Sequence, residues 1–342
     1  MKTLLFLSLL IIVACSEKPV KWTSSTNDNL WNQSSLSLKD AKDNAPFDLV
    51  VTDDTAQTID GFGGCFNELG WDALQRLAPQ TRDSILKELF TEEGFNFTLC
   101  RMPMGANDYS RKFYSYNETP GDFEMKNFSI SHDTTALLPY IKAAMKYNPR
   151  LKVWASPWCP PLWMKNNKHY ACRPDSAQND LPASGEGREG VNQFILKPDY
   201  MKAYALYFAK FVEAYRAEGV NLYAVHVQNE PNSCQVFPSC IWTSEALRDF
   251  IGKYLGPEFD KQKLNTNIWL GTIERPSVEK VDTVLTDSLA GRYVKGVGFQ
   301  WAGRGAIAGV HFKYPAMKLM QTETECGNGS NDWDAAEHTW DL

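Results

Sequence analysis

Apolar strand-like segments alternate with amphipathic helical segments along most of this chain, and this alternation constrains the fold more than any other feature. Apolar patterns with helical spacing cover 72–90, 136–147, 200–215 and 244–255, and Pro79 predicts a break within the first. The segments predicted to be strands are 55–66, 97–103, 151–156, 223–230, 267–271, 297–301 and 317–323. Strands that alternate with helices form parallel sheets, and this order favours a (β/α)8 TIM barrel, an α/β fold.

The predicted barrel covers residues 59–342 and lacks its eighth strand, because only a helical pattern at 334–342 follows the seventh. The chain has 342 residues, whereas one such barrel typically needs roughly 250, so additions are expected. The β-rich run 47–51 lies within 45–58, which we predict to supply one or two strands of an accessory β-sandwich. We therefore expect an incomplete barrel in a truncated sequence.

The N-terminus has the pattern of an export signal. Lys2 precedes an apolar run at 4–13 that is too short to span a membrane. Residues 12–15 are similar to the processing box of bacterial lipoproteins, so 1–15 is predicted to be a lipoprotein signal peptide with Cys15 as the lipid attachment site. The alternative is an ordinary signal peptide in which Cys15 is incidental.

The lipoprotein interpretation predicts an exported protein anchored to the bacterial outer membrane, on the periplasmic face or at the cell surface. Membrane contact is then expected only through the lipid on Cys15. Residues 16–44 are rich in Ser, Asn, Asp and Lys, and this polar composition is typical of a tether.

Composition and charge exclude several classes of function. The net charge is −6 and the pI about 5.5, and no block of Lys or Arg could follow a phosphate backbone, so we expect no nucleic-acid partner. The 11 Trp and 14 Tyr are typical of sugar-handling proteins, although packing accounts for most such rings in any protein. The eight cysteines form no Cys-x-x-Cys pair, so a zinc site is not expected, and Cys234 and Cys240 could close a small disulfide loop.

Two strand ends carry candidate catalytic carboxylates. The segment 223–231 alternates β-formers and ends in Asn229-Glu230-Pro231, which predicts a carboxylate at the C-terminal tip of the fourth strand; the alternative is a solvated surface turn. Glu323 and Glu325 lie at the end of the seventh strand, which faces the fourth across the mouth of a barrel. Paired carboxylates of this kind cleave glycosidic bonds with retention. They could also bind a divalent metal, but the accompanying His or Asp residues are absent, so we predict neither metal nor cofactor.

Five motifs in this order resemble glycoside hydrolase family 30, the family of lysosomal acid glucosylceramidase. The resemblance spans nearly all of residues 55–330. The motifs are Gly61-Phe62-Gly63-Gly64, Arg101-Met102-Pro103-Met104, Ser156-Pro157-Trp158 with Pro161 and Trp163-Met164-Lys165, Asn229-Glu230-Pro231, and Thr322-Glu323. Glucosylceramidase-like sequences have His-Trp at the end of the sixth strand, where this chain has Gln300-Trp301.

The resemblance implies a retaining β-glycosidase that acts on a β-glucoside, a glycolipid or a β-glucan, with Glu230 as acid/base. Alignment on Thr-Glu selects Glu323 as the nucleophile, whereas alignment on Glu-Cys selects Glu325 as the alternative. Within the family, a glucosylceramidase-like enzyme and an endo-β-1,6-glucanase stay open, and a non-catalytic glycan-binding surface lipoprotein is the alternative from another class. The residues expected to bind substrate are Asp108, Trp158, Asn229 and Trp301.

Overall fold

The computed structural model describes residues 20–36, 50, 52–324 and 333. Contacts divide the chain into two compact units, Met1–Gln57 with Glu325–Leu342, and Thr58–Thr324, and each is described by itself. Several predictions lie outside the described residues: Cys15, Glu325, the helix at 334–342 and, apart from Val50, the strand at 47–51.

In the first unit, residues 20–36 form an antiparallel hairpin of β1 (Val20–Thr26) and β2 (Asn29–Leu36). This differs from the tether predicted for 16–44. Thr26 pairs with Asn29, so Asn27 and Asp28 make a two-residue turn, a loop length and composition that favour hairpins. Local turn chemistry therefore outweighs the polar composition from which the tether was predicted.

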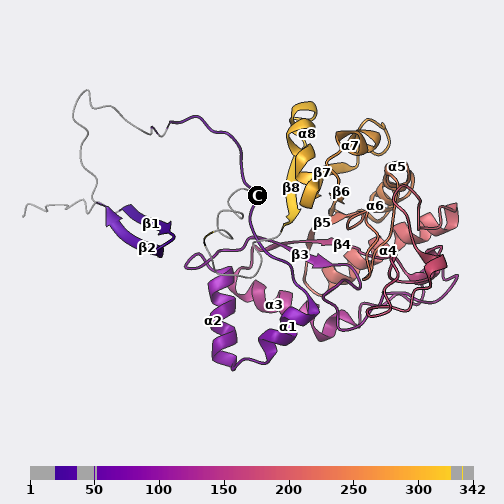
Figure 1. Cartoon of the computed structure of the whole chain (residues 1–342). Helices are drawn as coiled ribbons and strands as arrows, with labels where there is room; N and C mark the ends of the chain where they lie inside the picture. The colour runs from indigo at the N-terminus through magenta and orange to yellow at the C-terminus, as the bar shows by residue number, and fades with distance from the viewer. Residues whose placement is uncertain (1–19, 37–49, 51, 325–332, 334–342) are drawn as a thin grey trace, which may run out of the picture. The chain divides into compact units, whose positions relative to one another are not determined.

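The second unit is built on one parallel sheet with the strand order β3-β4-β5-β6-β7-β8 (Figure 1). Its six strands coincide with the last six predicted strands, and the curled sheet with its surrounding helices has the architecture of a TIM barrel. The strands are β3 (Leu99–Pro103), β4 (Lys152–Ser156), β5 (Leu222–His226), β6 (Asn267–Ile273), β7 (Val294–Gln300) and β8 (Lys318–Glu323).

The predicted first barrel strand, 55–66, forms a shorter ladder than expected. Only Cys65 is bridged to β3, through Arg101, although the Arg101 N–H donates to the Gly64 carbonyl at 2.9 Å. Glycine permits this close approach, because a Cβ on Gly63 would lie 2.1 Å from the Leu99 carbonyl oxygen. Residues 62–66 therefore lie beside β3 in the position of a first strand.

The helices follow the predicted pattern. The break predicted at Pro79 separates α1 from α2, with Pro79 at the first position of α2. The Thr243 hydroxyl accepts from the Ala246 N–H at 3.2 Å and caps α5, which continues through a π-turn (Ile251–Leu255) into α6. The helices are α1 (Glu68–Gln75), α2 (Pro79–Phe90), α3 (Leu137–Tyr147), α4 (Pro198–Ala217), α5 (Ser244–Phe250), α6 (Gly256–Gln262), α7 (Val278–Leu285) and α8 (Ile307–Lys313).

Much of the aromatic content lies in the core. Tyr204 of α4 stacks near Phe250 and Trp242, and all three are fully buried. Inside the sheet the His226 ring lies 4.2 Å from that of Trp154 and 5.2 Å from that of Trp269. The high Trp and Tyr content is therefore mainly a packing feature. Among the described residues no helix has both the length and the apolar character needed to cross a bilayer.

Candidate active site

Glu230 lies just beyond the C-terminal end of β5, as the sequence predicts. The regular strand ends at His226, but the backbone stays tied to its neighbours: the Gln228 N–H donates to the Gly271 carbonyl and the Asn229 N–H to the Pro157 carbonyl. Glu230 itself has φ +44° and is 7% exposed. A left-handed conformation is uncommon for a residue other than glycine and requires support from its surroundings.

Arg101 of β3 connects the C-terminal ends of β5 and β8. Its guanidinium forms an ion pair with Glu323 at the end of β8, with Nη1 and Oε2 2.5 Å apart. Nη2 donates to Asn229 Oδ1 at 2.6 Å and to Ser156 Oγ at 2.9 Å. Asn229 directly precedes Glu230, so one buried cation joins the ends of four strands that are distant in the sequence.

Asp108 shares the electrostatic environment of both glutamates. The pKa of Asp108 is raised, mainly because the surrounding protein removes water from its carboxylate. The negative charges of Glu323 and, more weakly, Glu230 raise this pKa further, whereas the positive charge of Arg101 lowers it. Its side chain nevertheless reaches solvent, in a turn where Asn107 Oδ1 accepts from the Tyr109 N–H. The charges of Glu323 and Glu230 are therefore near enough to Asp108 to influence its pKa.

The Asn229 amide has a defined orientation. Its Oδ1 accepts from Arg101 Nη2, from Thr272 Oγ1 at 3.1 Å and from Gln300 Nε2 at 3.3 Å. Because these donors identify the oxygen, Nδ2 faces the other way, and it donates to none of the described residues. An amide N–H with this orientation can donate to a bound hydroxyl.

The predicted tryptophans occupy different positions. Trp158 is buried, and the Arg101 guanidinium carbon lies 4.2 Å from its ring centre, so its ring supports Arg101. Trp301 directly follows β7, is 39% exposed, and presents an accessible ring. Gln300 lies inward, where it also accepts from Thr322 Oγ1 at 3.2 Å.

Comparison with known proteins identifies the family of this site. The sequence profile of the Glycosyl hydrolase family 30 TIM-barrel domain matches residues 59–342. The chain belongs to glycoside hydrolase family 30.

Three similar proteins carry two different named activities. Putative glucosylceramidase 1 of Caenorhabditis elegans is 33% identical over 317 residues, which cover 88% of this chain and 58% of the relative. Lysosomal acid glucosylceramidase of Mus musculus is 28% identical over 298 residues, covering 83% and 55%. A solved endo-β-1,6-glucanase structure is 27% identical with a TM-score of 0.75, covering 92% and 67%. The chain thus spans little more than half the length of the two glucosylceramidases.

Four residues that contact the candidate site or the turn after Glu230 were not assigned roles from the sequence: Arg101, Gln235, Thr272 and Glu274. Arg101 could have been noticed from the sequence, because it is a charged residue within the apolar segment 97–103. Glu274 could have been noticed as a carboxylate shortly after a predicted strand. Gln235 Nε2 donates to Glu230 Oε2 at 2.9 Å from a loop that carries no comparable signal.

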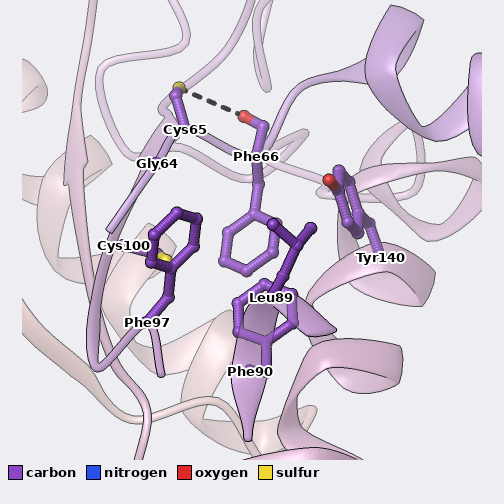
Figure 2. Close-up of a pocket in the computed structure, with 8 residues that line it drawn as sticks. All are labelled: Gly64, Cys65, Phe66, Leu89, Phe90, Phe97, Cys100 and Tyr140. Atoms are coloured by element: carbon purple, nitrogen blue, oxygen red, sulfur yellow. Dashed lines mark hydrogen bonds between the residues drawn. The ribbon is translucent and has the colours of Figure 1, made fainter. Parts of the chain in front are cut away.

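The other places considered as sites are a small pocket, the cysteines and possible metal-binding clusters. Figure 2 shows a pocket of about 40 Å³ between residues 64–66, α2 and α3, which has room for little more than a water molecule. In that view the Cys65 thiol is directed to the Phe66 carbonyl, away from the clustered rings. Cys234 and Cys240, which the sequence left open as a possible disulfide pair, are free thiols. Within the described part of the chain, no three His, Cys, Asp or Glu side chains gather closely enough to hold a metal ion.

Proposed function

We propose that this chain is the catalytic part of a retaining β-glycosidase that cleaves β-glucosidic bonds by double displacement. The observation that carries the proposal is the linkage of Glu230 and Glu323 through Arg101 and Asn229 at the C-terminal end of the sheet. Two carboxylates over one space are the groups that this chemistry requires. Membership of glycoside hydrolase family 30 supports the same reaction.

The two glutamates have different partners. Glu323 is ion-paired with Arg101, whereas Glu230 is buried and receives only the neutral Gln235 amide among the described residues. We therefore assign Glu323 as the nucleophile and Glu230 as the proton donor. In the first step Glu323 bonds to the anomeric carbon while Glu230 gives its proton to the leaving oxygen. In the second step Glu230 takes a proton from water, and the water oxygen displaces Glu323 from the sugar.

The remaining residues are proposed to hold the sugar. Asn229 Nδ2 has no other acceptor among the described residues and would donate to a sugar hydroxyl next to the reacting carbon. Asp108 would accept from hydroxyls, and the accessible ring of Trp301 would stack against a sugar face. Trp158 would act through Arg101, because its ring is buried against the guanidinium.

Two substrate classes follow from the relatives. Similarity to glucosylceramidases supports a glycolipid with a β-linked glucose, and similarity to the endo-β-1,6-glucanase over 92% of the chain supports a β-1,6-glucan. Gln300 affects this choice, since it orients Asn229 from the position where the resemblance leads us to expect histidine.

The test measures cleavage of an aryl β-glucoside, glucosylceramide and β-1,6-glucan by the chain and by its Glu230→Gln variant. Hydrolysis of the aryl glucoside with retention supports the mechanism, and the preferred natural substrate identifies the class. Binding of glucan without release of sugar from any of the three would contradict the proposal and favour a glycan-binding protein.

We also propose that the chain is exported and held at the bacterial outer membrane by lipid on Cys15. The proposal rests on the sequence pattern at 1–15, which lies outside the described residues.

A further inference from the structure

A second buried glutamate, Glu274, lies beside the turn that follows Glu230. It comes directly after β6 and is 2% exposed. Its Oε1 accepts from the Asn232 N–H at 2.8 Å and from Ser233 Oγ at 2.8 Å, and its Oε2 accepts from Asn232 Nδ2 at 3.2 Å. All three donors therefore belong to residues two and three positions after Glu230.

The backbone of Glu230 is held by contacts with this turn and with β6. Glu230 has φ +44°, and a residue other than glycine keeps this conformation only where neighbouring contacts enforce it. The Ser233 N–H closes the turn on the Glu230 carbonyl at 3.1 Å, and Thr272 Oγ1 accepts from the Glu230 N–H at 3.3 Å. Thr272 lies in β6 and Glu274 directly follows this strand. The end of one strand therefore contacts both the Glu230 backbone and the turn after it.

Charged groups around Glu274 complete the arrangement. Arg275 Nη1 lies 3.8 Å from Glu274 Oε1, and Lys280 Nζ donates to Asn232 Oδ1 at 2.8 Å. The exposed Glu189 pairs with both cations, at 3.1 and 3.8 Å. Burial raises the pKa of Glu274, its hydrogen bonds from Ser233 and Asn232 lower it, and the negative charge of Glu230 raises it. The turn 231–233 is thus fixed through hydrogen bonds to an acidic group that does not face solvent.

We propose that Glu274 is a positioning residue that orients Glu230 for proton transfer by clamping the turn 231–233. This inference rests on the proposed function, in which Glu230 is the acid/base. It assigns Glu274 no contact with the substrate. Its effect is expected only in steps that need the Glu230 proton.

The dependence of the rate on the leaving group separates positioning from general destabilisation. A 2,4-dinitrophenyl group departs without protonation, whereas an alkyl or unsubstituted phenyl group needs the acid, which contributes about 10²–10⁴-fold. Glu274→Ala is therefore expected to lower kcat/KM for phenyl β-glucoside by about tenfold or more and for the dinitrophenyl substrate by less than about threefold. Azide should raise kcat of the variant on the dinitrophenyl substrate, because deglycosylation then no longer needs the base. Glu274→Gln retains one acceptor oxygen and should recover part of the loss.

The matched control is Glu189→Ala, which removes an exposed partner of the same Arg275 and should leave the ratio of the two rates unchanged. Equal losses on both substrates, or no loss with Glu274→Ala, overturn the positioning role. If Glu274→Ala does not fold, Ser233→Ala removes the hydrogen bond from Ser233 Oγ to Glu274 Oε1. The comparison of the two aryl glucosides then decides for that variant. A wild-type chain that cleaves neither glucoside overturns the proposed function instead, so the two failures are distinguishable.

Discussion

Replacing Arg101 with Met gives the sharpest test of how this site is held together. The change keeps most of the side-chain volume but removes the charge that contacts Glu323, Asn229 and Ser156. Hydrogen bonds to charged groups contribute about 1.5–3 kcal/mol each. The Asn229 and Ser156 contacts are buried and retain most of that value, whereas Glu323 is 36% exposed and its ion pair is partly screened.

We therefore expect Arg101→Met to lower the free energy of unfolding by about 3–5 kcal/mol, as for other buried charges that lose a partner. It should also lower kcat/KM by about 10² or more, because Asn229 and Glu323 lose their common anchor. Arg101→Lys should recover part of the stability but little activity, since one ammonium cannot reach both sides of the site.

Urea denaturation followed by fluorescence measures the stability, and release of an aryl group measures the activity. Arg150→Met is the matched control: this arginine is 90% exposed, 3.6 Å from Glu92, and should change stability by no more than about 0.5 kcal/mol. The reasoning is refuted if the free energy of unfolding of Arg101→Met lies within about 1 kcal/mol of the wild-type value, close to the effect of an ordinary surface substitution.

Three further predictions address the nucleophile, pH and export. In the presence of azide, Glu230→Gln should be rescued on an activated aryl β-glucoside to give a β-glycosyl azide, whereas Glu323→Gln should not; near-native activity of Glu323→Gln with an inactive Glu325→Gln would transfer the nucleophile role to Glu325. Burial raises the pKa of Asp133 to about 6, although Tyr114, Tyr215 and Tyr116 donate to it, so the folded chain keeps a proton that the unfolded chain loses near its ordinary value of 3.8. The free energy of unfolding from this group should thus fall as pH rises from about 4 to 6, by about 1.4 kcal/mol per unit of pKa difference. Urea titrations of the wild type and Asp133→Asn at several pH values should diverge in that window, and parallel pH curves would contradict the assignment. Cys15→Ala should move the protein from the membrane to the soluble fraction, and unchanged membrane association would remove the lipid anchor.

Local pattern was sufficient to predict most elements of the barrel. The β-forming runs at 151–156 and 317–323 became β4, which is largely buried, and β8, which is only partly buried. The placement of Glu230 at a strand end also followed from local pattern, since Pro231 disfavours a helical backbone conformation at the residue before it. The hairpin at 20–36 was missed because composition was given more weight than the Asn27-Asp28 turn.

The sequence by itself determined the strand and helix order, the carboxylates at the ends of β5 and β8, and the family. Only the tertiary structure decided that Arg101 joins those ends, that Trp158 supports Arg101, and that Glu274 clamps the turn after Glu230. The physical reason is the range of each interaction. Periodicity and turn preferences act over a few neighbouring residues, whereas Arg101 and Glu323 are separated by 222 positions and meet only because the sheet curls. No local pattern encodes such a contact.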